Sequence, residues 1–362
     1  MSVWSPVAVL AAWFAVAYVA SAAATSWLVG WAAAQGVIDT PNARSSHTRA
    51  TPRGGGLAIV GVTSWAAIVA AVLSPEAWRP LASVMVPAIA IATVSWLDDL
   101  APLRNRVRFG VHLAAAVAAT ALLGPLRELN LGSLGRIDLG FAAWPLTLLW
   151  VVGMTNAFNF MDGIDGIAGI TAVAAGAALA TAAGLLGLDV LSSVALAFAA
   201  ASAGFLACNW PPARIFMGDV GSAFCGFLIA VLPLAGGGES AARLVPVAAI
   251  TMWPFIFDTA FTLCRRLSRR ENVFQAHRSH LYQRLVIAGW SHRAVSSLYG
   301  GLSAMAAVIA VSPIAGVCPE RTATNLAAAT VLVGAALLLV LVHLASAASA
   351  LQAEGRRPSG AP

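Results

Sequence analysis

Eleven long apolar segments dominate the chain and limit what it can fold into. Only 10% of its 362 residues are charged and 59% are hydrophobic, whereas soluble domains carry about a quarter charged residues. Crossing the hydrocarbon core takes about 20 helical residues, and most segments reach or approach that length. The segments cover 6–29, 56–73, 81–97, 109–124, 142–158, 167–187, 190–208, 221–236, 243–263, 295–312 and 325–347. We therefore predict an all-α polytopic bundle of eleven transmembrane helices, or ten.

The segments follow one another without a second globular region. We expect a single integral-membrane domain over residues 1–350 and a polar, disordered cytoplasmic tail over 351–362. Segments 167–187 and 190–208 are joined only by residues 188–189, and this short connection predicts a tight turn. The loop 125–141 predicts a small hairpin around Leu131–Gly135, to which we assign no chemical role.

The arginines predict the orientation. All 21 basic residues are arginine, and 16 of them lie in alternate loops on one face of the bundle. Basic residues gather in cytoplasmic loops, so this face is predicted to be cytoplasmic. The N-terminus is then outside and the C-terminus inside. We attribute the net charge of +6 to topology and to phosphate contacts, not to nucleic acid.

Five aspartates lie where apolar segments meet short polar loops, and all five fall on the predicted cytoplasmic face. Charge in or near hydrocarbon costs several kcal/mol unless it is paired or hydrated, so such acids are candidates for function. If they meet, oxygen ligands without Cys or His indicate a hard cation, Mg²⁺ or Mn²⁺. The five are Asp98, Asp99, Asp162, Asp165 and Asp219.

The adjacent pair Asp98-Asp99 ends the third apolar segment. Neighbouring carboxylates repel each other, and a cation between or beside them relieves the repulsion. The alternative is a solvated helix end balanced by Arg104, Arg106 and Arg108. The pair by itself does not separate the two interpretations.

Four polar residues recur every third position in Asn156-Ala-Phe-Asn159-Phe-Met-Asp162-Gly-Ile-Asp165-Gly. Residues three apart share a helical face, so a helix that continued through the motif would align them. Amides and carboxylates so arranged can coordinate a metal ion and bind a sugar, ribose or diphosphate. The alternative is an Asn/Asp/Gly turn between two spans. We favour function, because a plain turn does not need four polar side chains in register.

Two further segments carry candidate residues on the same face. Asp219, in Phe-Met-Gly-Asp-Val-Gly-Ser, lies near a helix N-terminus, where a simple N-cap is the alternative to a metal ligand. Residues 41–56 contain three arginines, including Arg53, and end in three glycines. This loop is either an anion-binding loop or a topology signal with a flexible linker.

The long loop 264–294 contains His277-Arg278-Ser-His280. A zinc site is disfavoured because the loop offers no third nitrogen or sulfur ligand nearby. Donors for a diphosphate fit better, and a basic amphipathic helix on anionic lipid is the alternative. Within segment 243–263, Pro254 predicts a kink. Asp258 is expected to pair with Arg265 or Arg266, or else to line the site, and we favour the structural role.

Taken in this order, these motifs resemble the polyprenyl-phosphate N-acetylhexosamine-1-phosphate transferase family of glycosyltransferases. The resemblance runs from Asp39-Thr-Pro41 to His280. It implies a bundle of ten or eleven helices in the bacterial plasma membrane with a cytoplasmic active site. It also implies Mg²⁺, a UDP-activated amino sugar and undecaprenyl phosphate as substrates, and UMP and a lipid-linked sugar pyrophosphate as products. A homodimer is compatible with it, and no oligomeric state is fixed by sequence.

The family's residue roles carry over to matching positions. Asp98 and Asp99 match the acidic pair that orients or deprotonates the lipid phosphate and helps to hold the metal. Asp219 matches the metal-binding aspartate, and Asn159 is expected to share that ligation. The nucleotide-sugar loop contributes Asn156 to substrate binding and Asp162 and Asp165 as further catalytic residues. The other substrate-binding matches are Arg53 in the first loop and His277, Arg278 and His280 in the histidine loop.

The histidine loop also narrows the branch of the family. His-Arg-Ser-His replaces three consecutive histidines of the MurNAc-pentapeptide branch, which argues against peptidoglycan precursor synthesis. The chain is more similar to branches that start O-antigen or other surface glycans with GlcNAc or a 6-deoxy-amino sugar.

Two other classes of membrane protein are disfavoured. An ion-coupled transporter would place lone acids in mid-span and show an inverted repeat, and neither is seen. An intramembrane aspartyl protease would need the motif Gly-x-Gly-Asp. In this chain Met217-Gly-Asp219 is not preceded by the first glycine of that motif.

Overall fold

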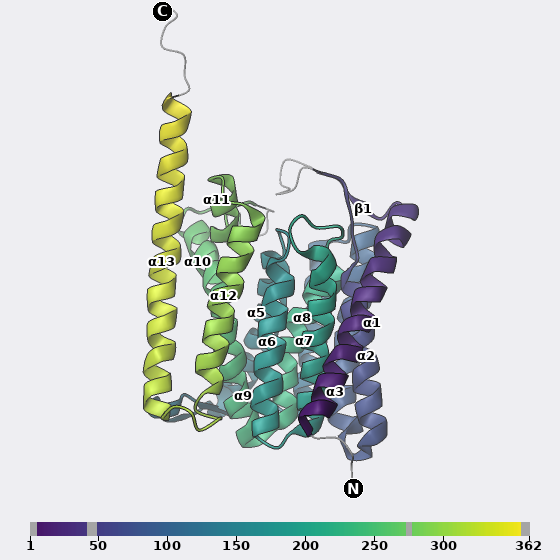
Figure 1. Ribbon diagram of the computed structural model, residues 1–362. Helices are drawn as coiled ribbons and strands as arrows, with labels where there is room; N and C mark the ends of the chain where they lie inside the picture. Colours follow the sequence, from purple (N-terminus) through teal and green to yellow (C-terminus); the bar gives the residue numbers. More distant parts are fainter. Residues whose placement is uncertain (1–5, 42–48, 273–276, 356–362) are drawn as a thin grey trace, which may run out of the picture.

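The computed structural model describes residues 6–41, 49–272 and 277–355 and shows helices standing side by side (Figure 1). Within these ranges, ten helical stretches are long and apolar enough to cross a membrane, and the bent pair α9–α10 makes an eleventh. The long helices are α1 Pro6–Ala34, α2 Gly56–Leu73, α3 Trp78–Leu100, α4 Asn105–Leu123, α5 Ala143–Met161, α6 Ile167–Leu185, α7 Asp189–Asn209, α8 Asp219–Val231, α9 Gly238–Thr251, α10 Trp253–Ser268, α12 His292–Val311 and α13 Glu320–Gly355. The predicted all-α polytopic bundle is confirmed.

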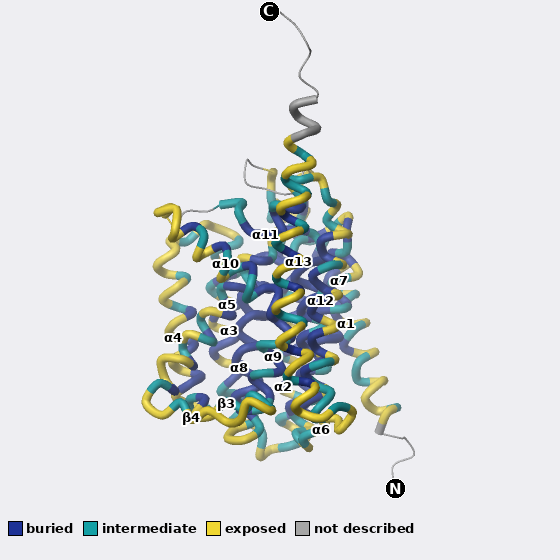
Figure 2. The backbone as a smooth tube through the Cα atoms, turned by 90° about the vertical axis from the view of Figure 1, so that its left-hand side faces the viewer, coloured by how far each residue is buried: buried dark blue, intermediate teal, exposed yellow. Residues whose placement is uncertain are grey.

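Short elements join the spans. Strand β1 (Ile38–Asp39) pairs with β2 (Thr51–Pro52), and the predicted hairpin is formed by β3 (Glu128–Asn130) and β4 (Arg136–Asp138). The seven-residue helix α11 (Leu281–Ile287) lies at the end of the bundle opposite this hairpin (Figure 2). Single turns of 3-10 helix complete the connections: η1 Pro75–Ala77, η2 Gly132–Leu134, η3 Gly140–Ala142 and η4 Leu232–Gly236.

The ninth apolar segment is broken as its proline predicts. Helices α9 and α10 meet at Met252 with a bend of 68°. Pro254 lies in the first turn of α10, where its missing N–H costs no hydrogen bond. The break turns α10 away from the path of α9, so that Asp258 faces α11 and α12 instead of continuing along the span.

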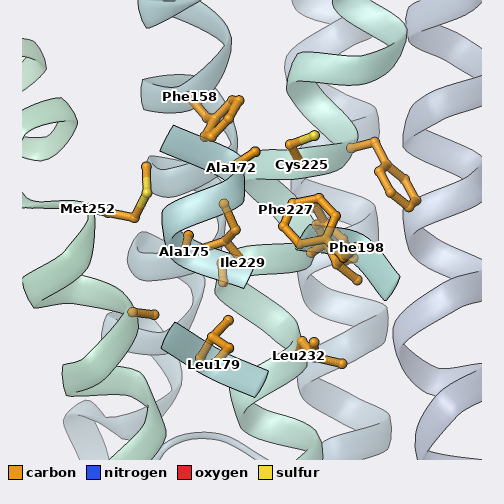
Figure 3. Close-up of a cluster of buried hydrophobic side chains, with 14 of the residues drawn as sticks. Phe158, Ala172, Ala175, Leu179, Phe198, Cys225, Phe227, Ile229, Leu232 and Met252 are labelled. Carbon is orange, nitrogen blue, oxygen red and sulfur yellow. The ribbon is translucent and has the colours of Figure 1, made fainter. Parts of the chain in front are cut away.

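Helix α8 forms the centre of the bundle, and every residue from Val220 to Val231 is buried. Phe158, Phe198 and Phe227 are fully buried in a cluster that also contains Ala172 and Ala175 of α6 (Figure 3). The outer faces carry exposed apolar side chains such as Trp27 and Ile68. Large apolar side chains on the outside of so apolar a chain are typical of contact with lipid, and the protein is a multi-pass membrane protein.

The glycines of the first loop serve close packing. A Cβ on Gly56 would overlap Gly221 of α8, and the two helices touch there through backbone. Gly55 and Gly56 donate their N–H groups to the carbonyls of Phe216 and Met217 at 2.9 Å. The part of the loop over residues 42–48 lies outside the described residues. The described glycines therefore pack against the start of α8. Neither interpretation of this loop, as an anion-binding loop or as a topology signal with a flexible linker, predicted this packing.

Candidate active site

Four helix ends meet at the end of the bundle where β1 lies in Figure 1. They are the C-terminal ends of α3 and α5 and the N-terminal ends of α4 and α8. Each brings a predicted residue or an arginine into one cluster, which we call the aspartate–arginine cluster. It consists of Arg53, Asp98, Asp99, Arg108, Asn159 and Asp219.

Asp99 caps helix α8 from another helix. Its two carboxylate oxygens accept the backbone N–H groups of Asp219 and Val220 at 2.9 and 3.0 Å. A carboxylate is favoured there because the first N–H groups of a helix lack partners and carry partial positive charge. The side chain is fully buried. The sequence interpretation that Asp219 itself is the N-cap is therefore wrong: Asp219 is the first residue of α8, and its carboxylate is left for other contacts.

Arg108 joins the acids of three helices. Its guanidinium lies 2.9 Å from Asp98 Oδ2 and 2.6 Å from Asp219 Oδ2, and it donates to Asn159 Oδ1 at 3.2 Å. In the sequence, Arg108 was one of three arginines expected to balance Asp98-Asp99 if this pair were a solvated helix end, and it does pair with Asp98. Helix α4 begins at Asn105, four residues before the apolar segment, and this start places Arg108 in its first turn.

Arg53 supplies the second guanidinium. It lies 2.8 Å from Asp99 Oδ1 and 3.4 Å from Asp219 Oδ1. The backbone fixes its position, because Phe216 donates its N–H to the Pro52 carbonyl at 2.8 Å. Two arginines thus face three carboxylates, and about a third of the Arg53 side chain remains exposed to an incoming anion.

The oxygen atoms of the cluster gather around one positive charge. Asp98, Asp219 and Asn159 direct oxygens at one guanidinium, that of Arg108, so positive charge is required at this point. Asn159 also donates to Ser222 Oγ at 2.8 Å, which fixes the orientation of its amide. Within the described ranges, no three His, Cys, Asp or Glu side chains could hold a metal ion by themselves. A cation would therefore share this place with the guanidinium or displace it.

The four residues spaced three apart do not share one face. Helix α5 ends at Met161, and Gly166 adopts a φ of +82°, which turns the chain into α6. Asn159 reaches the cluster, whereas Asn156 donates to the Val152 carbonyl of its own helix at 2.7 Å. The expected continuous helix is wrong because the chain leaves helical geometry at Asp162, with φ −82° and ψ 59°.

Asp165 lies in a different set of contacts. Its carboxylate is 3.3 Å from His292 Nδ1 on α12 and accepts the Ala213 N–H at 3.1 Å. Ser296 donates to its carbonyl oxygen at 2.7 Å. Asp165 therefore ties the turn after α5 to α12 and to the loop before α8. Its predicted role towards the nucleotide sugar stays a prediction.

Asp162, the residue after the end of α5, lies between the aspartate–arginine cluster and the contacts of Asp165. Burial, followed by the neighbouring Asp219 carboxylate, raises the pKa of Asp162 from 3.8 to about 8. Arg53 acts in the opposite direction and does not outweigh them. Asp162 is thus protonated at neutral pH when nothing else is bound, and added positive charge nearby would ionise it.

The histidine loop docks onto this turn through Tyr282 of α11. The Tyr282 hydroxyl donates to the Phe160 carbonyl at 3.2 Å, and it lies directly against Gly163, where any side chain would collide with it. The rings of His277 and His280 are 5.1 Å apart. Arg278 leaves its buried Nε without a hydrogen-bond partner among the described residues.

The expected partner of Asp258 is wrong. Asp258 accepts hydrogen bonds from the first backbone N–H groups of α11 and from side chains of α10, α12 and the histidine loop, not from Arg265 or Arg266. Those arginines bind Ser279 and Glu271 instead. The broken span explains the error, because a straight helix would have kept Asp258 away from α11.

Comparison with known proteins identifies the family. The chain is 34% identical over 262 residues to a probable undecaprenyl-phosphate N-acetylglucosaminyl 1-phosphate transferase of Bacillus subtilis, covering 71% of this chain and 72% of the relative. The profile of glycosyl transferase family 4 matches residues 81–237. The chain belongs to glycosyl transferase family 4.

Other members of glycosyl transferase family 4 have different acceptors or sugars in their names. The decaprenyl-phosphate N-acetylglucosaminephosphotransferase of Mycobacterium tuberculosis H37Rv is 30% identical over 340 residues, 85% of this chain and 83% of the relative. A phospho-N-acetylmuramoyl-pentapeptide-transferase of a Synechococcus strain is 30% identical over 289 residues, 76% and 82%. The relatives indicate a polyprenyl-phosphate sugar-phosphate transferase.

The family match and the geometry overlap in most of the site. Asp98, Asp99, Asn159 and Asp219 all fall within residues 81–237, whereas Arg53 and the histidine loop lie outside that range. Ser222 and Tyr282 are site residues that the sequence analysis did not assign to the site. Arg108 was named only as a charge that balances Asp98-Asp99, and its place between three acidic or amide side chains was not predicted.

Proposed function

We propose that the protein transfers an N-acetylhexosamine-1-phosphate from a UDP-sugar to undecaprenyl phosphate and releases UMP. The observation that carries the proposal is the aspartate–arginine cluster, in which two guanidinium groups and three carboxylates meet at one end of a membrane bundle. A transfer between a membrane lipid and a water-soluble nucleotide sugar needs a polar site at one end of the bundle, where both substrates can reach it.

Charge is the main obstacle to this reaction. Both substrates are anions, so the site must offset their repulsion before they can approach. Arg53 and Arg108 supply two positive charges beside the point of transfer. In the substrate-free protein these charges are balanced by Asp98, Asp99 and Asp219, which keeps them from being buried unpaired.

The transfer itself is a substitution at the β-phosphorus. An oxygen of the lipid phosphate forms a bond to the β-phosphorus, the bond from this phosphorus to the bridging oxygen breaks, and UMP leaves with that oxygen. Asp98 orients the lipid phosphate through Arg108 and accepts the proton that the phosphate carries. Asp99 keeps the N-terminus of α8 in place and so positions Asp219.

A divalent cation fits the oxygen donors of Asp219 and Asn159, with Mg²⁺ preferred and Mn²⁺ as the alternative. When bound, it neutralises the diphosphate and stabilises the leaving UMP. Asn156 and Asp165 are proposed to face the nucleotide sugar, with Asp162 between them and the cluster. His277, Arg278 and His280 are proposed to donate hydrogen bonds to the diphosphate and sugar.

The proposed location is the bacterial plasma membrane, with the cluster and the C-terminus on the cytoplasmic side and the N-terminus outside. The arginine-rich loops support this orientation. They lie at the same end of the bundle as α11, and the β3–β4 hairpin lies at the other end (Figure 2).

The test is an assay with purified protein in detergent or nanodiscs. The protein is incubated with undecaprenyl phosphate, Mg²⁺ and a panel containing UDP-GlcNAc, UDP-6-deoxy-amino sugars and UDP-MurNAc-pentapeptide, and UMP is measured. We expect UMP with one of the amino sugars. UMP with UDP-MurNAc-pentapeptide alone would move the protein to the peptidoglycan branch, for which the Synechococcus relative is the supporting likeness. No UMP with any donor would contradict the proposal.

A further inference from the structure

The histidine loop is held by one buried carboxylate, that of Asp258, which lies outside the aspartate–arginine cluster. Asp258 is fully buried in α10. Its Oδ1 accepts from His280 Nδ1 at 3.1 Å and from the Leu281 N–H at 2.8 Å. Its Oδ2 accepts from the Tyr282 N–H at 3.1 Å and from the Tyr299 hydroxyl at 2.8 Å. A buried carboxylate with this many donors is fixed in place.

These contacts determine the orientation of the His280 ring. A carboxylate accepts and cannot donate, so Nδ1 of His280 carries a proton and Nε2 is the one ring nitrogen left for another partner. The ring also stacks on Tyr282 at 5.8 Å between centroids. His280 therefore has a fixed protonation site and a fixed plane, as groups that orient a reacting partner require.

The same carboxylate links His280 to the turn after α5. Asp258 binds the Tyr282 N–H, and the other end of Tyr282 donates to the Phe160 carbonyl at 3.2 Å. Burial, followed by the charge of Asp258, raises the pKa of Tyr282 well above its usual value, so its hydroxyl remains a donor. Asn159, which belongs to the aspartate–arginine cluster, immediately precedes Phe160.

From this geometry we propose that Asp258 is a positioning residue for the transfer: it fixes His280 with Nε2 directed to the sugar diphosphate and sets the histidine loop against the turn after α5. The proposal rests on the proposed function. Asp258 touches no substrate itself and acts through His280. The break between α9 and α10 contributes to this positioning, because it turns Asp258 towards α11.

The test is a double-mutant cycle on UMP release. Asp258→Asn keeps the shape and one acceptor oxygen but places an N–H₂ group among donors. We expect kcat to fall on the order of 10- to 100-fold, as for other residues that orient a functional histidine. If Asp258 acts through His280, the same change in a His280→Ala background lowers kcat by less than about threefold.

Two isosteric variants complete the cycle. Thr262→Val removes only the longest bond to the carboxylate, from Thr262 Oγ1 at 3.2 Å, and is the matched control, expected to stay within about twofold of the unmodified protein. Tyr299→Phe leaves the chain of packed rings intact and removes one donor to Oδ2, so we expect a smaller loss that also vanishes in His280→Ala. This variant keeps the test open if Asp258→Asn does not yield folded protein.

The outcomes separate the two proposals. If the unmodified protein releases no UMP, the proposed function fails, and the role of Asp258 in the transfer fails with it. If the unmodified protein is active and Asp258→Asn is equally active, or the losses from Asp258→Asn and His280→Ala multiply in full, Asp258 does not act through His280 and this inference is overturned.

Discussion

The role of Asp99 is the sharpest consequence of the geometry, because sequence places it beside Asp98 as a second catalytic acid. In the structure it caps α8 and faces Arg53. Asp99→Asn keeps one acceptor oxygen, sets an N–H₂ group against a backbone N–H and removes the partner charge of a largely buried arginine. Losing one hydrogen bond to a charged group costs about 1.5–3 kcal/mol, and losing a helix cap about 1 kcal/mol.

Together these losses predict a destabilisation of about 3 kcal/mol. For a chain of this length that corresponds to a thermal midpoint lower by roughly 5 °C. The assay is thermal unfolding in detergent, followed by size-exclusion of the remaining folded protein. Asp219→Asn is the comparison variant, because its carboxylate pairs with the same Arg53 and with Arg108 but caps no helix. We expect Asp219→Asn to shift the midpoint less than Asp99→Asn does, because it removes ion pairs but no helix cap.

Both variants should lose transferase activity, but for different reasons. Asp219→Asn removes a group at the point of transfer, whereas Asp99→Asn displaces that group by loosening the start of α8. Equal midpoints for Asp99→Asn and the unmodified protein, or a larger shift for Asp219→Asn, would refute the assignment of Asp99 as the cap of α8.

Three further results are expected. Arg108→Ala lowers UMP release on the order of 100-fold or more, as loss of a charge-stabilising donor does, whereas the exposed Arg106→Ala stays near normal; comparable losses would remove Arg108 from the site. Gly56→Ala lowers the thermal midpoint or prevents folding, because its Cβ would overlap Gly221, whereas Gly61→Ala, with open space around it, is tolerated; a stable Gly56→Ala protein would contradict the close packing of α2 on α8. Protonated Asp162 stabilises the metal-free protein, and this stability is lost as pH rises from about 4 to about 8; an Asp162→Asn variant with the same pH profile of thermal midpoint would exclude Asp162 as its source.

Much of the bundle could be predicted from sequence because lipid imposes simple rules. Apolar length gave the spans, and Pro254 gave the break between α9 and α10. The short connection between Leu185 and Asp189 and the β3–β4 hairpin also agree with expectation. In a bilayer every backbone polar group must be satisfied within the span, so helix is the one regular choice for each long apolar segment.

The sequence predicted which residues belong to the site better than it predicted how they are arranged. Spacing suggested that Asn156, Asn159, Asp162 and Asp165 share a face, but the helix ends within the motif and distributes them over different contacts. A helix period describes neighbours only while the helix continues. The end of α5 depends on how the next turn packs against Tyr282.

Partners between distant segments were the hardest to predict. The cap of α8 comes from Asp99, 120 positions earlier, and Asp258 binds donors more than 20 positions away. Local sequence offered Asp219 as the cap and Arg265 or Arg266 as the partners of Asp258. Each local choice was chemically sound, but tertiary packing supplied a different acceptor for the start of α8 and different donors for Asp258.

The most direct test of the central claim follows the β-phosphorus. The purified protein is given undecaprenyl phosphate, Mg²⁺ and the UDP-amino sugar that supports turnover, labelled with ³²P at the β-position. Sugar-1-phosphate transfer predicts that the label enters the lipid extract, that UMP is unlabelled, and that Asp219→Asn abolishes both products. Label left in UDP, with only the sugar in the lipid, would contradict the account, as would normal transfer by Asp219→Asn.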